Sequence, residues 1–359
     1  MIGVRLRVAS IFLLLMGASV ASRAESWDAD VWRSADRLFR SDPRWLGSDA
    51  AFSVSLGDDR ILWLFGDTFI GDGKVKRAKS AFIRNSIAVQ RGRDLSFARI
   101  DFYWGGSAEA PASFFPATPD AWLWPLHGVH RDGALTLFFM RLGHTPEGLR
   151  FRIDGSAALR CENPEEPPER WKFRALALSK APFTGASLVG VAILQEQDSV
   201  LAYCVADTEF HPAYLLRWHS VDFDRGDLSA PEWWDGTRFA AQRDLSGPPA
   251  AVIPAAATEF SVHRQLDGRY IQVQTVGFGA AVVEARFAAR PEGPWSEPEE
   301  LFRPRESGWR DTMVYAGKAH PELSGAPLVV TYATNHFDPE KLLRNKRLYY
   351  PRFIRVSPK

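Results

Sequence analysis

The sequence predicts an all-β protein, a five-bladed β-propeller whose blades are four-stranded antiparallel sheets. Short runs of alternating apolar and polar residues recur along most of the chain, separated by turns rich in Gly, Pro and Asp. Pairs of these runs form hairpins whose turn centres lie about 50 to 80 residues apart, which leaves room for four strands per unit. Five such units close into a ring that leaves only short, protected sheet edges.

The N-terminus has the pattern of a secretion signal. A positively charged start precedes a short apolar core at Ile11–Met16, and Ala21 and Ala24 offer small residues for cleavage. The apolar run is too short to span a membrane in the mature chain. We therefore expect a secreted or periplasmic protein with no membrane partner, in which residues 1–24 are removed and residues 25–359 form one propeller domain. A retained, uncleaved anchor is the alternative.

Composition excludes several classes of function. The net charge is +1 with no long charged block, so the sequence predicts no nucleic-acid partner. The chain lacks the sequence motifs of nucleotide cofactors, zinc proteases and serine hydrolases, so we expect neither cofactor nor metal. Cys161 and Cys204 are the only cysteines, and they form either one disulfide or two buried thiols. The 13 Trp and 24 Phe are mostly core residues, although sugar-binding clefts also use them. We expect a monomer.

The first predicted hairpin carries two acidic residues. The alternating runs Ala51–Ser55 and Ile61–Phe65 flank a polar turn around Asp58. Asp49 and Asp67 each lie nine residues from Asp58, so a hairpin centred there makes them cross-strand partners. Directly opposed side chains share a face, with Cβ atoms about 5 Å apart. The sequence thus predicts two neighbouring carboxylates at one rim of the sheet.

Four further hairpins complete the predicted ring. Their strands are Trp124–His130 with Ala134–Arg141, Val200–Val205 with Ala213–Trp218, Glu259–Gln265 with Tyr270–Thr275, and Tyr315–Glu322 with Leu328–Asn335. The C-terminal run Leu348–Val356 is expected as a late strand of the last blade. The segment before Asp49 is expected to supply the missing strand that closes the ring, and Trp32–Phe39 within it is either a helical turn or that strand.

This architecture predicts a ligand site at one mouth of the central channel. The first strand of each blade lines the channel, so the residues at its start meet at that mouth; the third blade stays unassigned. Convergent polar groups in a concave mouth indicate a ligand site. A purely structural channel is the alternative. The predicted mouth residues, with their partners across each turn, are Asp49 with Asp67, Trp124 with Arg141, Glu259 with Gln274, and Tyr315 with Asn335.

Several segments resemble a known family. WLGSDAAFSV, LWLFGDTFIG, RNSIAV, GPWSEPEELF and YAGKAHPEL with VVTYATN are similar to secreted five-bladed propellers of a family that includes endo-D-arabinanases. That family long carried only the label of a domain of unknown function, and its fold is related to that of arabinanase and fructosidase propellers. The resemblance implies that Asp49 and Asp67, the latter in the Gly-Asp-Thr motif, form the catalytic pair. The middle blades differ from those of the family and set substrate choice, so the resemblance says little about the substrate.

Glycosidase chemistry suits the same pair. One carboxylate acts as nucleophile or base, and one carboxylic acid protonates the leaving oxygen. The predicted adjacency lies near the separation of about 5 Å that suits retention, although the sequence leaves retention and inversion open. Repulsion should raise one pKa and leave that group a proton to donate. We assign Asp67 as nucleophile and Asp49 as acid/base, with the swapped roles as alternative. The competing hypothesis is that both residues only cap turns.

Other residues are expected around this pair. Asn85 opens the next alternating run and is expected to bind a sugar hydroxyl, to orient Asp67 or to cap its own strand. Glu259 is the best third carboxylate, either as the acid, as a neighbour that tunes a pKa or as part of a rim salt bridge. Trp124 is expected either to stack on a sugar ring or to lie in the core.

The remaining candidates are weaker. Arg141, Tyr315 and Asn335 could bind anions or hydroxyl groups at the predicted mouth. His320 and His127 lie on predicted inner strands and are either ligand-binding residues or satisfied histidines of the channel.

The sequence thus favours a secreted glycoside hydrolase that acts on a furanose-containing, arabinan-like polysaccharide or oligosaccharide. A non-catalytic carbohydrate-binding or cell-envelope propeller is the alternative. A propeller that binds proteins through its blade edges is a third class.

Overall fold

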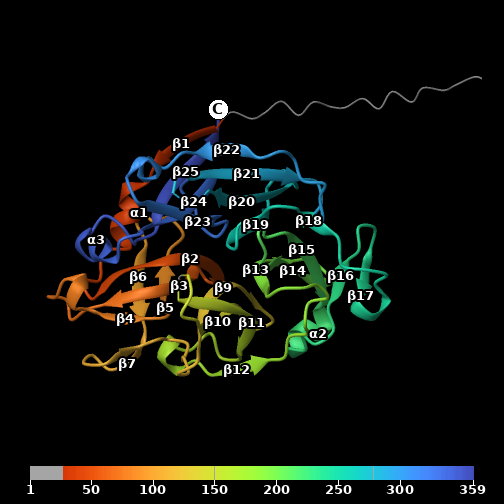
Figure 1. Cartoon of the computed structure of the whole chain (residues 1–359), viewed down its shortest axis with the longest axis horizontal. Coiled ribbons are helices and arrows are strands. Elements are labelled where there is room, and N and C mark those ends of the chain that lie inside the picture. The colour runs from red at the N-terminus through yellow and green to blue at the C-terminus, as the bar shows by residue number, and fades with distance from the viewer. Residues whose placement is uncertain (1–26, 149, 278) are drawn as a thin grey trace, which may run out of the picture.

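The computed structural model describes residues 27–359 apart from 149 and 278, and it is a five-bladed β-propeller (Figure 1). The innermost strands of the five blades contact one another in sequence around the ring, and the last contacts the first. The predicted fold class is therefore confirmed. The predicted secretion signal lies outside the described residues.

The first two blades follow the predicted hairpins. Blade 1 consists of β2 (Trp45–Gly57), β3 (Arg60–Ile70), β5 (Ser86–Arg91) and β6 (Arg99–Tyr103), with β4 (Ala81–Ile83) paired to the end of β3. Blade 2 consists of β9 (Ala121–Arg131), β10 (Ala134–His144), β11 (Phe151–Cys161) and β12 (Phe173–Leu176). A two-stranded sheet of β7 (Gly105–Gly106) and β8 (Pro111–Ala112) lies between them in the chain.

The other three blades have the same antiparallel order from the inside outward. Blade 3 consists of β13 (Ser187–Gln195), β14 (Ser199–Ala206), β15 (Ala213–His219), β16 (Glu232–Trp234) and β17 (Phe239–Ala241), with β18 (Ala251–Ile253) beside β15. Blade 4 consists of β19 (Phe260–Arg264), β20 (Tyr270–Val276), β21 (Val282–Ala288) and β22 (Glu299–Phe302). Blade 5 consists of β23 (Thr312–Ala319), β24 (Leu328–His336), β25 (Arg352–Pro358) and β1 (Trp27–Val31).

Blade 3 corrects one predicted hairpin. The predicted pair Val200–Val205 and Ala213–Trp218 exists as β14 and β15, but it forms the middle of the blade. The innermost strand is β13, which pairs with β14. Residues Leu188–Leu194 of β13 are buried throughout, so the strand lacks the alternation of a half-buried strand and was missed.

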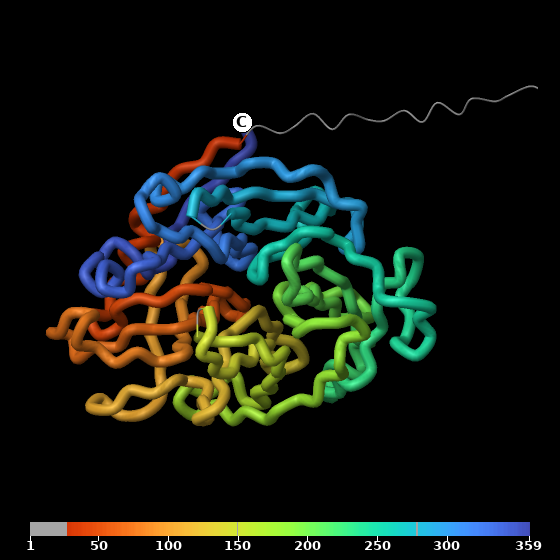
Figure 2. Tube along the Cα trace, in the orientation of Figure 1, coloured from red at the N-terminus to blue at the C-terminus, as the bar shows by residue number. Residues whose placement is uncertain are grey.

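The N-terminal segment closes the ring, as predicted. Figure 2 shows the first strand running beside the last, and β1 pairs antiparallel with β25. Helix α1 (Arg33–Leu38) follows β1, so the segment Trp32–Phe39 is helical and the closing strand precedes it. Asp36 of this helix bonds Arg352 of β25 at 2.8 Å, and buried Glu306 bonds the same guanidinium at 2.9 Å. This buried ion-pair network ties the two ends of the chain together.

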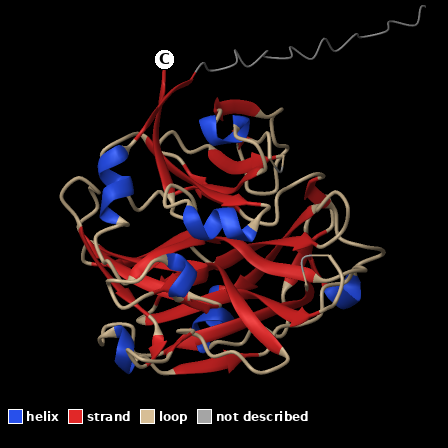
Figure 3. Cartoon of the chain, turned by 60° about the vertical axis from the view of Figure 1, so that its left-hand side comes forward, coloured by secondary structure: helices blue, strands red, loops and turns tan. Residues whose placement is uncertain are grey.

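The helices are short and lie outside the sheets (Figure 3). Besides α1 they are α2 (Ser220–Arg225), α3 (Pro339–Arg344) and the 3₁₀ turns η1 (Arg77–Lys79), η2 (Pro168–Arg170), η3 (Gln242–Asp244) and η4 (Arg305–Gly308). Asp338 caps α3 by accepting from the backbone N–H of Glu340, and Pro339 occupies the first turn. Within the described part of the chain, no helix has the length and apolar character needed to cross a membrane.

The core lies between neighbouring blades. Central strands are buried on both faces; Ile61–Phe65 of β3, for example, is buried at every position. One cluster joins blades 1, 2 and 3, and a second packs α1 against blades 1 and 5 through Phe39, Trp63 and Phe353. Cys161 and Cys204 are free, buried thiols, which decides between the two predicted alternatives. Sheet-on-sheet packing thus fixes the positions at which each inner strand begins.

Candidate active site

Asp49 in β2 and Asp67 in β3 lie side by side, and both are partly exposed. The predicted register of their hairpin is found from Phe52 to Ser55 and again at Ser48, which pairs with Thr68. Between these points the ladder is interrupted, because Ala50 pairs with Phe65, so that first β3 and then β2 carries one extra residue. Such bulges re-aim side chains and are frequent next to active sites.

Local sequence makes room for the pair. A Cβ atom added to Gly66 would lie 2.6 Å from Oδ1 of Asp49, so only glycine lets the Asp49 carboxylate rest against β3. Beneath the bulge, the buried hydroxyl of Ser48 donates to the carbonyl oxygen of Asp67 at 2.7 Å. Thr68 Oγ1 in turn donates to Ser48 at 3.0 Å. This buried polar network fixes the backbone that carries both carboxylates.

Hydrogen-bond donors from three blades meet the two carboxylates. Tyr315 of β23 donates its O–H to Asp49 Oδ2 at 2.6 Å. Trp124 of β9 donates its indole N–H to Asp67 Oδ1 at 2.8 Å. Arg84, just before β5, forms an ion pair with Asp67 at 3.3 Å. Each carboxylate therefore has donors of its own.

The electrostatic environment gives the two carboxyl groups different pKa values. Burial and, after it, the charge of Asp67 raise the pKa of Asp49 to about 7. Burial also raises the pKa of Asp67 to about 6, but the Arg84 charge and the bonds from Trp124 and Arg84 act in the opposite direction. Of the two, Asp49 therefore holds its proton to the higher pH, while Asp67 is the more readily ionised partner. An acid beside a carboxylate is the arrangement that general acid catalysis needs.

Comparison with known proteins places the chain in a family. A family model described as a domain of unknown function (DUF5005) matches residues 33–358. The chain belongs to this family. The description of the family names no activity, so the resemblance to endo-D-arabinanases stays a prediction. Among curated proteins, none matches.

Solved structures share the fold of this family member. A protein from Bacteroides ovatus ATCC 8483, described provisionally as a hydrolase, superposes with a TM-score of 0.72 at 19% identity, covering 92% of this chain and 90% of that one. The catalytic domain of a GH62 α-L-arabinofuranosidase from Coprinopsis cinerea gives a TM-score of 0.50 at 11% identity, covering 93% and 98%. At these identities the likeness shows the propeller fold alone.

Four other predicted residues lie at or next to the carboxylate pair. Trp124 and Tyr315 bond the two acids directly. Asn335 donates to the Tyr315 hydroxyl at 3.3 Å, although it pairs with Met313 in the ladder and not with Tyr315. Glu259, just before β19, bonds Lys318 at 2.9 Å, and its charge also contributes to the raised pKa of Asp49.

Two predicted ligand-binding residues, Asn85 and Arg141, have other surroundings. The amide of Asn85 is buried and bonds the backbone of Phe115 and Leu123, so it holds the segment that leads to Trp124. Arg141 pairs with Leu123 and is exposed, because a bulge in β9 shifts the predicted register by one residue and turns Arg141 to the other face of the sheet from Trp124.

The histidines belong to the channel. His320 is buried, and its two ring nitrogens bond the hydroxyls of Ser53 and Thr331, each at 2.7 Å. His127 accepts from the backbone N–H of Ile193 at 2.9 Å. The structure thus favours satisfied channel histidines over ligand-binding residues.

Sequence reasoning missed Arg84, Lys318 and Tyr349. Arg84 immediately precedes Asn85 in the RNSIAV segment. The residue of this segment that contacts Asp67 is therefore Arg84 and not Asn85. Lys318 is a charged residue among small residues on a predicted inner strand, which was a usable signal. The charges of Asp49 and Asp67 help to raise the pKa of Tyr349, which places its buried ring near the pair. Tyr349 falls within the predicted strand Leu348–Val356, but β25 begins only at Arg352 and Tyr349 lies in the loop before it.

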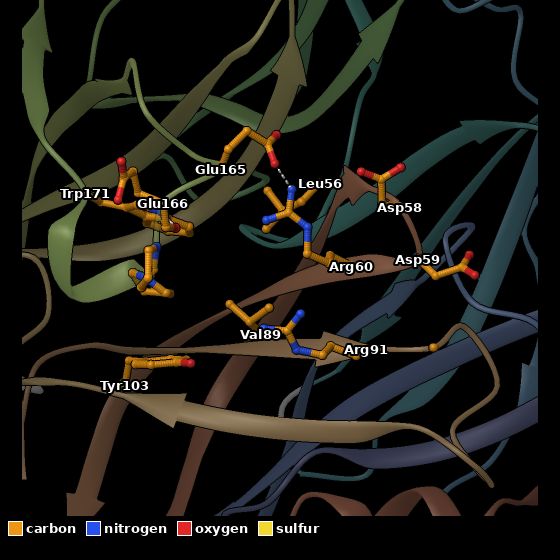
Figure 4. A pocket seen from close by; sticks show the side chains of 13 residues that line it. Leu56, Asp58, Asp59, Arg60, Val89, Arg91, Tyr103, Glu165, Glu166 and Trp171 are labelled. Atoms are coloured by element: carbon orange, nitrogen blue, oxygen red, sulfur yellow. Dashed lines mark hydrogen bonds and ion pairs between the residues drawn. The ribbon is translucent and has the colours of Figure 1, made fainter.

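A groove lies at a different place on the propeller. It has a volume of about 590 Å³ at the turn end of blade 1, beside the loop that contains η2. Figure 4 shows Tyr103, Arg91 and Trp171 along it, with an ion pair between Arg60 and Glu165 across it. Within the described residues, no cluster of three or more His, Cys, Asp or Glu side chains is arranged to hold a metal ion. The paired carboxylates therefore remain the best-defined chemical centre.

Proposed function

We propose that this protein is a secreted glycoside hydrolase that cleaves a furanose-containing, arabinan-like polysaccharide with Asp49 and Asp67. The observation that carries the proposal is the pair itself, in which burial and mutual repulsion raise the pKa of Asp49 to about 7 while Arg84 and Trp124 favour the ionised form of Asp67. Two carboxyl groups with pKa values pushed apart are what glycoside hydrolysis requires.

The proposed roles follow from the donors. Asp49 acts as acid, since it holds the proton that the leaving oxygen needs. Asp67 acts as nucleophile or base, since the N–H of Trp124 and the Arg84 guanidinium stabilise its charge. Tyr315 orients Asp49 through its 2.6 Å bond, and Asn335 orients Tyr315. The predicted closeness of the two carboxyl groups favours retention, and the anomer of the first product decides it.

The proposed substrate class rests on similarity to other proteins. The resemblance of the segments in the first and last blades to endo-D-arabinanases supports a furanose polymer. The Coprinopsis cinerea structure, described as an α-L-arabinofuranosidase, points to the same kind of sugar. Secretion is proposed from the N-terminal pattern of residues 1–24, and it suits a polymeric substrate that cannot enter a cell.

The test is hydrolysis of a polymer panel with product analysis. The full mature chain is incubated with L-arabinan, D-arabinan, levan, inulin and xylan, and the products are separated by chromatography. We expect release of oligosaccharides from one or more furanose polymers and none from xylan. Release from xylan alone would assign a pyranose substrate and overturn the substrate class.

Variants separate catalysis from binding. Asp49→Asn and Asp67→Asn should each remove turnover while the affinity for the hydrolysed polymer, measured by calorimetry, persists. Asp58→Asn is the matched control, because Asp58 is exposed at the turn of the same hairpin and has a positive φ that Asn tolerates. Binding of a polymer by the wild-type protein without turnover on the whole panel would favour the non-catalytic carbohydrate-binding propeller.

A further inference from the structure

Lys318 is a buried cation that bonds the backbone next to Asp49. Its side chain is 1% exposed, and its ammonium donates to Ala50 O at 2.7 Å, to Ala316 O at 2.9 Å and to Glu259 Oε2 at 2.9 Å. Lysine has three N–H donors, so all of them are used. The ammonium also lies 4.2 Å from the centre of the Phe52 ring. Strands of blades 1 and 5 and the start of blade 4 thus meet at one charge.

The two carbonyl acceptors belong to unusual backbone. Ala50 has a φ of 64° and Ala316 a φ of 56°, a left-handed conformation that residues with a Cβ seldom adopt. Both residues lie at interruptions of their strand ladders. Ala50 directly follows Asp49, and Ala316 directly follows Tyr315, which donates to Asp49. Backbone of this kind persists only when surrounding contacts enforce it, and it clusters at functional sites.

The charge of Lys318 affects the pKa values of the ionisable groups around it. It opposes the rise in the pKa of Asp49 that burial and the charges of Asp67 and Glu259 cause. It adds to the effect of burial, which lowers the pKa of His127 to about 4 and that of His320 far below its ordinary value. Both histidines are therefore neutral through the pH range of a rate measurement. The ionisable groups facing Lys318 are Asp49 on β2, His127 on β9, Glu259 before β19 and His320 just after β23.

We propose that Lys318 is a positioning residue, whose ammonium clamps the Ala50 and Ala316 bulges so that Asp49 and Tyr315 meet in the reactive arrangement. Its second contact is the 2.9 Å ion pair with Glu259, which holds that carboxylate against Lys318. The role of Asp49 as acid rests on the proposed function; the clamp itself rests on the contacts of Lys318 alone.

The first experiment compares Lys318→Met with wild type on the polymer that the wild-type protein hydrolyses. Met keeps the length of the side chain but removes the charge and the three donors. We expect kcat to fall about 100-fold, the loss that a small misplacement of a reacting group causes, with KM changed little. The basic limb of the pH profile should move to higher pH, because Asp49 loses a neighbouring positive charge. Lys180→Met, at an exposed lysine in the loop between β12 and β13, is the control.

The double variant Lys318→Met/Glu259→Gln separates the two effects of the ammonium. Removing both charges should return the basic limb towards the wild-type position, whereas kcat should stay low because the two bulge carbonyls still lack their donor. Recovery of kcat in the double variant would show that Lys318 only neutralises Glu259, and the clamp would be overturned.

A readout without turnover tests the effect of the Lys318 charge on Asp49 independently of the proposed hydrolase activity. The side-chain carboxyl carbon of Asp49, assigned by its disappearance in Asp49→Asn, is titrated by ¹³C NMR in the wild-type and Lys318→Met chains. The titration midpoint should rise in Lys318→Met; an unchanged or lower midpoint contradicts the proposal. If wild type hydrolyses nothing, the proposed function fails and this titration still decides whether the Lys318 charge acts on Asp49. If Lys318→Met does not fold, Lys318→Arg replaces it, with low kcat and an unmoved basic limb expected; wild-type kcat would overturn the clamp.

Discussion

The two ends of the channel-lining strands differ in what their titratable side chains contact. At one end Asp49 and Asp67 lie beside each other, each bonded by a donor from a different blade. At the turn end, about 17 to 20 Å further along β2, a cavity of about 260 Å³ is lined by residues that include Ser55, Glu196 and Glu322.

At the turn end each of these groups has a partner of its own. Ser53 donates to Glu322 at 2.8 Å, and Tyr270 donates to Glu196 at 2.7 Å. Burial raises the pKa of Glu322 to about 7, the same value as that of Asp49. A shifted pKa by itself therefore does not mark a reactive site. What distinguishes the Asp49 end is a second carboxylate within electrostatic reach, since only there can one group hold a proton while its neighbour carries the charge.

The largest expected difference between the two ends is the effect on kcat of replacing a carboxylate by an amide. Asp67→Asn should lower kcat by at least about 10³-fold, because an amide can act neither as nucleophile nor as base. Glu322→Gln should stay within about twofold of wild type on the same polymer. The measurement is initial rate at saturating substrate. A comparable loss in both variants would mean that the channel as a whole, and not the carboxylate pair, determines activity.

The second effect concerns how closely β3 approaches Asp49. Gly66→Ala adds a methyl group 2.6 Å from Asp49 Oδ1, so the carboxylate must move. We expect kcat to fall about 100-fold without loss of the fold, as for other small displacements of reacting groups. Gly247→Ala is the control, since nothing lies within 4 Å of a Cβ atom at that position. An unaffected Gly66→Ala enzyme would show that the position of Asp49 is not critical.

The first two hairpins show how much of the strand register could be predicted from the sequence. The turn around Asp58 gave the register of the first hairpin correctly, since the extra residues on β2 and β3 compensate each other around Asp49. In the second hairpin the extra residue of β9 is uncompensated, and Arg141 therefore faces away from the site. Bulges leave almost no trace in the alternation of apolar and polar residues, so a register shift of one residue is invisible in the sequence.

Contacts between blades were the second kind of feature that the sequence did not predict. The propeller, its closure by the N-terminal segment and the Asp pair follow from local patterns within one hairpin or one strand. The bonds from Trp124 to Asp67 and from Lys318 to Glu259 join residues 57 and 59 positions apart, and they depend on how neighbouring sheets pack. Strand β13, buried on both faces, was missed because alternation requires one solvent-facing side.

A smaller effect is expected from the donor to Asp67. Trp124→Phe keeps the ring but removes the N–H that stabilises the carboxylate at 2.8 Å. The pKa of Asp67 should therefore rise, and the acidic limb of the pH profile of kcat/KM should move to higher pH, with a loss of about tenfold or less at acidic pH. Trp234→Phe in blade 3 is the control. A shift of the acidic limb to lower pH would contradict the role of Asp67 as the ionised partner.

The smallest expected effect lies at the turn end and appears in stability alone. The pKa of Glu322 is raised from 4.5 to about 7 in the folded chain, so the folded state binds more protons than the unfolded state between these values. Wild type should therefore lose stability through this group as the pH rises through that interval, and Glu322→Gln should lose less. Asp49 and Asp67 contribute with the same sign in both proteins, so the difference isolates Glu322. Melting temperatures at pH 5 and pH 8 measure it: a gap between variant and wild type that does not widen in favour of the variant at pH 8 would show that Glu322 is not buried in its neutral form.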